Sequence, residues 1–76
     1  MPRDDVNDSD LLKSKMRREP FRPFIIELRS GIQILVDADT EIFFPRKWPG
    51  LIVAFTAGGL IHEFEVNAIG QLVEAT

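Results

Sequence analysis

The chain has 76 residues, of which 45% are hydrophobic and 28% charged, and its formal net charge is −3. This length suits a single domain with a small core, and the absence of cysteine excludes a disulfide framework and a thiolate metal site. No apolar run approaches the roughly 18 residues of a membrane span, and the N-terminus lacks the layout of a secretory signal. We therefore expect a cytoplasmic protein that binds no membrane.

Charge is distributed unevenly along the chain. Five basic residues and one acidic residue lie between positions 13 and 22, whereas no Lys or Arg follows position 50. This balance differs from that of a dedicated nucleic-acid binder, which is basic overall. The basic stretch makes Arg17, Arg18 and Arg22 candidates for contact with an anion. The alternative is a solvated helix end, where cations are favoured.

The first predicted elements are a disordered lead-in over residues 1–8 and a helix over residues 9–18, which opens a single domain over residues 9–76. Asp8 or Ser9 caps the first turn, and Pro20 cannot continue the helix. A helix this short is marginal alone. We expect it to dock through Leu11, Leu12 and Met16.

After Pro20 the apolar period changes to two, which is typical of strands. The Ser30-Gly31 and Gly58-Gly59 pairs predict hairpin turns, the second with both glycines at positive φ. Consecutive short strands favour an antiparallel meander that curls into a small barrel, because closure removes unpaired edges. The fold class is thus mainly β (α+β): a helix and a five-stranded barrel. The five predicted strands span residues 24–29, 32–37, 51–56, 60–66 and 71–75, with a short corner at 67–70.

Strand alternation assigns one sheet face to the core and leaves the other partly apolar. The predicted core is Phe24, Ile26, Leu28, Ile32, Ile34, Val36, Leu51, Val53, Phe55, Leu60, Phe64 and Val66. The second face carries Ile25, Leu35, Ile52 and Ile61. The N-terminal helix or a second copy can cover such a patch. We expect self-association through it, as a homodimer or small ring.

The segment over residues 43–49 combines three aromatic residues with two cations and two prolines. Its candidate partner-binding residues are Phe43, Phe44, Arg46, Lys47 and Trp48. Trp and Arg are enriched at interface hot spots, and aromatic rings beside cations also stack unpaired bases. The third interpretation is a lid that plugs one end of the barrel.

No residue set points to catalysis or to a metal. His62 is the single histidine, and we expect a half-buried strand residue that bonds to backbone. A carboxylate pair can divide acid and base roles. We expect Glu63 and Glu65 instead to face solvent from the outer side of one strand. A calcium site is conceivable at the alternating acidic residues Asp37, Asp39 and Glu41. Their segment lacks the glycine and the distal glutamate of an EF-hand calcium loop. We expect no enzymatic activity and no cofactor.

The motif Pro20-Phe21-Arg22-Pro23-Phe24, after a short helix and before an I-x-L strand, resembles a family of small bacterial proteins of unknown function. The resemblance covers roughly residues 11–74 and implies a domain size and a fold. Members carry a His-Pro-Glu where this chain has Asp39-Thr40-Glu41. The element order is also similar to Sm-like RNA-binding barrels, without their Asn loop or basic Gly loop.

Two functions follow from these observations. The first is a non-enzymatic protein-interaction or assembly module, whose partner is another protein or a second copy. The alternative is an Sm-like protein that binds RNA. Salt separates them, because phosphate binding weakens steeply with ionic strength and apolar burial does not.

Overall fold

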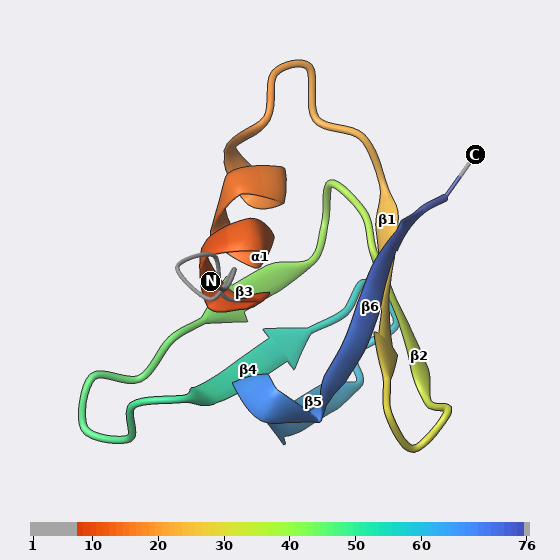
Figure 1. Ribbon diagram of the computed structural model, residues 1–76. Helices are drawn as coiled ribbons and strands as arrows, with labels where there is room; N and C mark the ends of the chain where they lie inside the picture. The colour runs from red at the N-terminus through yellow and green to blue at the C-terminus, as the bar shows by residue number, and fades with distance from the viewer. Residues whose placement is uncertain (1–7, 76) are drawn as a thin grey trace, which may run out of the picture.

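The computed structural model describes residues 8–75, which form one helix and six strands in two sheets (Figure 1). The sheets have the orders β2-β1-β6 and β3-β4-β5, and all neighbouring strands are antiparallel. No ladder joins the two sheets within residues 8–75. The elements are α1 Asp8–Arg17, β1 Phe24–Leu28, β2 Gln33–Val36, β3 Glu41–Phe43, β4 Leu51–Phe55, β5 Ile61–Glu65, the 3₁₀ segment η2 Val66–Ala68 and β6 Ile69–Glu74.

The α+β class and the antiparallel pairing are confirmed, but the count of five strands and the single meander are wrong. β3 lies between the second and third predicted strands, where the sequence pattern predicts no strand. A turn redirects the chain before it: the Asp37 carboxylate accepts from the Asp39 N–H at 2.9 Å and from the Thr40 hydroxyl at 3.1 Å. Thr40 is buried in this turn. The turn carries the chain from one sheet to the other, so β2 and β3 do not pair.

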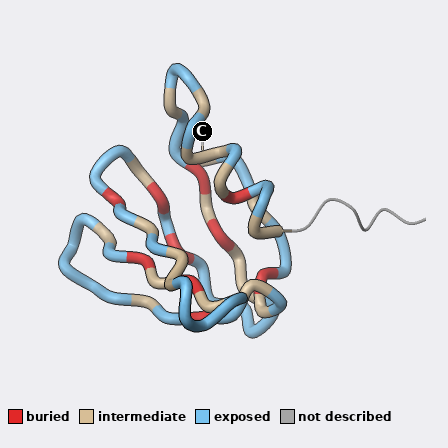
Figure 2. The backbone as a smooth tube through the Cα atoms, turned by 90° about the vertical axis from the view of Figure 1, so that its left-hand side faces the viewer, coloured by how far each residue is buried: buried red, intermediate tan, exposed pale blue. Residues whose placement is uncertain are grey.

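The core lies where the inner faces of the two sheets meet (Figure 2). Alternation along β1 and β2 predicts this part correctly, because each strand has one apolar and one mixed face. Phe24 and Ile26 of β1 and Ile34 and Val36 of β2 are buried, as predicted. The full set of buried apolar residues is Leu12, Phe24, Ile26, Ile34, Val36, Ile52, Ala54, Phe64 and Ile69.

Helix α1 seals the side of the core beside η2 and does not cover an outer sheet face. Leu12 is 0% exposed and Met16 packs against the core, whereas Leu11 is 43% exposed. The docking prediction is therefore confirmed for Leu12 and Met16 and wrong for Leu11, which lies on the solvent side. The predicted lead-in lies outside the described residues apart from Asp8, which begins the helix.

The hairpin between β4 and β5 closes with a turn in which Gly59 alone is left-handed. Gly59 has φ 85°, and Gly58 does not have a positive φ, so the prediction of two positive-φ glycines is wrong. The Gly59 N–H donates to the Thr56 carbonyl at 2.9 Å, and the Thr56 N–H donates to the Leu60 carbonyl at 3.0 Å. This is a turn followed by a left-handed glycine, one residue longer than a two-residue loop.

That extra residue decides which face of β4 is buried. A two-residue turn would pair Val53 with Phe64, whereas the observed register pairs Ile52 with Phe64. Directly paired residues share a face, so Ile52 joins Phe64 between the sheets and is 1% exposed. The assignments of Leu51, Val53 and Phe55 to the core and of Ile52 to the second face are therefore wrong.

The β1–β2 hairpin repeats the same turn with Gly31 at φ 99°. Its Gly31 N–H donates to the Leu28 carbonyl at 2.9 Å, and the Leu28 N–H donates to the Ile32 carbonyl at 2.8 Å. Ile32 and Leu60 occupy equivalent positions directly after the two left-handed glycines, outside the strands. Both are exposed and neither belongs to the core, which corrects their assignment.

The final strand returns the chain to the first. The N–H of Arg29 donates to the Ala68 carbonyl at 2.8 Å and its Nε to the Asn67 carbonyl at 2.8 Å, which fixes η2 against the end of β1. β6 then pairs with β1, with a register shift between Glu27 and Leu28 that leaves Gly70 unpaired. A Cβ at Gly70 would lie 3.2 Å from the Glu27 carbonyl oxygen, so glycine suits this close approach.

Candidate protein-interaction face

The outer face of β3, β4 and β5 carries a group of apolar side chains that point away from the core. Alternation places Leu51, Val53 and Phe55 of β4 on this side, because Ile52 and Ala54 face inward. The register sets Phe43 of β3 beside Val53 and Ile61 of β5 beside Phe55. We call this surface the aromatic face; it also includes the carboxylates of Glu41, Glu63 and Glu65.

Three exposed carboxylates flank the apolar side chains of β4. Glu41 of β3 pairs with Phe55, while Glu63 and Glu65 of β5 pair with Val53 and Leu51. None of the three strands contains Lys or Arg. The aromatic face is therefore a central apolar strip on β4 with negative charge on both neighbouring strands.

The two phenylalanines of the aromatic face contact each other directly. The ring centroids of Phe43 and Phe55 lie 5.3 Å apart at an interplanar angle of 87°, an edge-to-face geometry. Phe43 nevertheless stays 50% exposed, Phe55 37% and Ile61 60%. These side chains hold one another in place and still present their surface to solvent.

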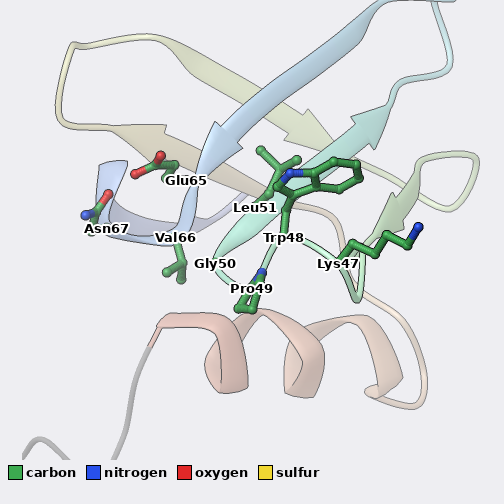
Figure 3. Close-up of a pocket in the computed structure, with 8 residues that line it drawn as sticks. All are labelled: Lys47, Trp48, Pro49, Gly50, Leu51, Glu65, Val66 and Asn67. Carbon is green, nitrogen blue, oxygen red and sulfur yellow. The ribbon is translucent and has the colours of Figure 1, made fainter.

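Trp48, three residues before the first residue of β4, extends the apolar strip past Leu51. The Trp48-Pro49-Gly50-Leu51 segment is a tight turn with the Leu51 N–H donating to the Trp48 carbonyl at 3.0 Å and Gly50 at φ 90°. Pro before a left-handed Gly is typical of a type II turn. Figure 3 shows the indole alongside Leu51, on the side of the strand away from α1.

A hollow of about 390 Å³ lies at this end of the strip. Trp48 and Leu51 form its apolar wall, and Glu65 and Asn67 supply polar groups. The Lys47 side chain lines the hollow at its outer end and extends away from Glu65 (Figure 3). The Val66 N–H donates to the Gly50 carbonyl at 2.7 Å and ties the loop to the end of β5.

The predicted partner-binding residues divide between the core and the surface. Phe44 packs against the core, and Lys13 Nζ of α1 lies 4.8 Å from its ring centroid. Phe43 and Trp48 point outward, and Arg46 and Lys47 are exposed in the loop. Among the five candidates, Phe44 therefore lies in the interior, and the other four lie at the surface.

The predicted self-association residues do not form one patch. Ile52 is in the core and Ile61 is on the aromatic face. Ile25 and Leu35 lie side by side on the outer face of the other sheet, where Val73 of β6 is the second partner of Ile25. Ile25 is half-buried, and Leu35 and Val73 are exposed. We call Leu35, Ile25 and Val73 the neutral row.

The candidate anion-binding arginines have different surroundings. Arg18 Nη1 donates to Glu74 Oε2 at 2.7 Å, and Lys15 Nζ donates to the same oxygen at 2.9 Å. The hydrogen bond from Lys15 makes the largest contribution and that from Arg18 the next, and together they lower the pKa of Glu74 from 4.5 to about 2. Arg17 and Arg22 are exposed. Lys15 of α1 and Arg18, which directly follows the helix, thus both bind Glu74 of β6. Arg17 and Arg18 line the same hollow.

His62 points to the inner side of β5, opposite Ala54, and is half-buried as expected. Its ring makes no hydrogen bond to any other described residue, so the expected backbone bond is absent. The carboxylate of Asp37 is occupied within its own turn. Within residues 8–75, no group of three His, Cys, Asp or Glu side chains is arranged to hold a metal ion.

In the described part of the chain, no helix is long and apolar enough to cross a membrane. Comparison of the chain with protein-family models, with curated proteins and with solved structures gives no match. The function proposed next therefore depends on the geometry of the chain itself.

Proposed function

We propose that the protein is a non-enzymatic interaction module that binds another protein through the aromatic face. The observation that carries this proposal is the contiguous set of outward apolar side chains on all three strands of one sheet. Contiguous apolar patches of this kind mark interaction sites. Trp48 adds a residue type that is enriched at binding hot spots, 63% exposed at one end of the strip.

A second copy is the partner that we propose for the neutral row. Its three aliphatic side chains lie in one register row across β2, β1 and β6. The neighbouring row consists of Gln33, Glu27 and Gln71, and the Glu27 carboxylate accepts a hydrogen bond from the Gln71 amide. A two-fold axis would pack this row against itself with little charge repulsion.

The alternative proposal is an Sm-like barrel that binds RNA. Three cations in and directly after α1 support it, because Lys13, Arg17 and Arg18 line one hollow. Two observations weigh against it. Arg18 already binds Glu74, and the carboxylates of the aromatic face repel phosphate. We therefore favour the protein-interaction module.

Site-specific photo-crosslinking in the cells that make the protein tests the proposed function. A benzophenone amino acid replaces Ile61 on the aromatic face. The matched control replaces Glu19, an exposed residue of the loop between α1 and β1, which lies far from β4 and β5 in Figure 1. We expect a discrete protein adduct at position 61 and none at position 19. An adduct that nuclease removes, or no adduct at position 61, would contradict the proposal.

A further inference from the structure

We infer that the element which binds the aromatic face is a basic amphipathic helix of the partner protein. This inference rests on the proposed function and specifies the chemistry and shape of the partner.

The charge of the face selects a cationic partner. Glu41, Glu63 and Glu65 are exposed, and each lies beside an apolar side chain of β4. β3, β4 and β5 contain no Lys or Arg, and the cations Arg46 and Lys47 lie in the loop between β3 and β4. A partner that buries the apolar strip must therefore bring Lys or Arg to its edges. Nucleic acids and anionic membranes carry the same sign as the face and are disfavoured.

The positions of the carboxylates fit a helix. Neighbouring strands are about 4.8 Å apart, so the distance from β3 to β5 is about 10 Å, close to the diameter of an α-helix. A helix that lies along β4 places an apolar stripe on Leu51, Val53 and Phe55. Basic residues on the two flanks of that stripe then reach Glu41 on one side and Glu63 and Glu65 on the other.

The length of the strip sets the length of the helix. Leu51 to Phe55 spans about 13 Å at 3.3 Å per strand residue, which corresponds to between two and three helical turns. The hollow next to Leu51 has Trp48 as an apolar wall and Glu65 in its lining, and the Lys47 side chain at its outer end extends away from Glu65 (Figure 3). An Arg or Lys side chain suits this hollow, because its stem is apolar and its end is cationic.

A second copy of this chain does not supply the helix. Leu12 and Met16 of α1 face their own core, and Leu11, on the solvent side, is the only exposed apolar side chain of this helix. Face-to-face pairing of two aromatic faces would bring carboxylates against carboxylates without any cation of the three strands between them. The occupant is therefore another protein.

A peptide titration tests the inference, with Trp48 as reporter because it is the only tryptophan in the chain. The probe is a synthetic peptide of about 14 residues with a Leu stripe at helical spacing and Lys on both flanks. One control peptide has Glu in place of every Lys, and a second has the same composition in scrambled order. We expect the Lys-flanked peptide to shift Trp48 emission to shorter wavelength and to bind at least about tenfold more tightly than either control.

Substitutions in the protein locate the contact. The double variant Glu63→Gln, Glu65→Gln should weaken binding about fivefold and reduce its salt dependence, since each exposed ion pair contributes modestly. The control variant Glu19→Gln removes an exposed carboxylate from the loop between α1 and β1 and should leave affinity unchanged. Thermal melting of all variants confirms that they fold.

The outcomes separate the inference from the proposed function. Equal binding of the Lys-flanked and Glu-flanked peptides, or of the scrambled peptide, would overturn the basic helix. A crosslinked partner at position 61 would still support the interaction face in that case. Unchanged affinity in the Glu63→Gln, Glu65→Gln variant would also refute the inference, whereas loss of the adduct at position 61 would refute the proposed function.

Discussion

Ile52 is a fully buried side chain on a strand whose residues are all apolar. It packs between the sheets beside Phe64, whereas Phe55 on the same strand is 37% exposed. We expect Ile52→Val to lower the free energy of unfolding by about 0.5–1.5 kcal/mol and Ile52→Ala by about 2–5 kcal/mol. Phe55→Ala loses mainly the edge-to-face contact with Phe43, so we expect it to lower the free energy of unfolding by about 1 kcal/mol. Urea denaturation of the variants gives these values.

The comparison of Ile52→Ala with Phe55→Ala tests which face of β4 is buried. If Phe55→Ala destabilises the protein as much as Ile52→Ala, Phe55 lies in the core and the aromatic face does not exist. Ile52→Val serves as the control for a variant that fails to fold, because it removes a single methyl group and keeps the side chain apolar.

Glu74 is the residue whose titration affects stability. Hydrogen bonds from Lys15 and then Arg18 hold its folded pKa at about 2, against 4.5 ordinarily. As pH falls, the unfolded chain takes up the proton first. The stabilisation is therefore complete above about pH 4.5 and is lost as pH falls toward 2. The carboxylate is 42% exposed, so solvent screening keeps the effect small.

We therefore expect Glu74→Gln to melt at a slightly lower temperature than the parent at pH 7, and the difference to shrink below about pH 4.5 and disappear as pH falls through about 2. Thermal melts followed by circular dichroism across this range measure the difference. High salt should also reduce it, because both partners are partly exposed. A difference that persists unchanged at pH 2 would show that the ion pairs are not its cause.

Among the elements, the β4–β5 turn fixes the register and hence the two faces of β4. Gly59 has φ 85° and Gly58 does not have a positive φ. We expect Gly59→Ala to destabilise the protein by about 1–2 kcal/mol, because an alanine is strained in the left-handed region. Gly58→Ala should be neutral or stabilise by up to about 1 kcal/mol, since its Cβ meets no atom within 4 Å. Equal destabilisation by both substitutions would indicate a turn with two left-handed glycines.

The sequence predicted those elements in which local pattern and burial agree. β1 and β2 alternate between apolar and mixed faces, so their strands and their buried residues follow from periodicity alone. The helix is predicted to within one residue at each end, because Asp8 and Pro20 bound it. β3 was missed because it is short and precedes a segment with two prolines.

The aromatic face was predicted only in part, for a reason specific to β4. Leu51, Ile52, Val53 and Ala54 are all apolar, so periodicity identifies the strand and does not assign its faces. The register with β5 makes that assignment, and it depends on one residue of the turn. Phe43 and Trp48 were found as candidates because aromatic and basic residues are concentrated in one loop.

For the whole molecule, the two outer sheet faces differ in charge and therefore in the partner that suits them. The aromatic face combines apolar side chains with three carboxylates, which repel a second identical face. The neutral row consists of aliphatic side chains beside two glutamines and a hydrogen-bonded glutamate. We therefore propose that self-association and binding of another protein use different sheet faces, so that both can occur in one complex.

The oligomeric state tests this division. We expect the parent protein to sediment as a homodimer at micromolar concentration and Leu35→Lys to sediment as a folded monomer, because a lysine in the neutral row would place two cations against each other across a two-fold axis. Ile61→Lys is the matched control: Ile61 is 60% exposed on the aromatic face, so this variant should remain dimeric. If Ile61→Lys also dissociates the dimer, the aromatic face is the homodimer interface and is not free for another protein. A parent that sediments as a monomer at high concentration would show that the neutral row is not an interface.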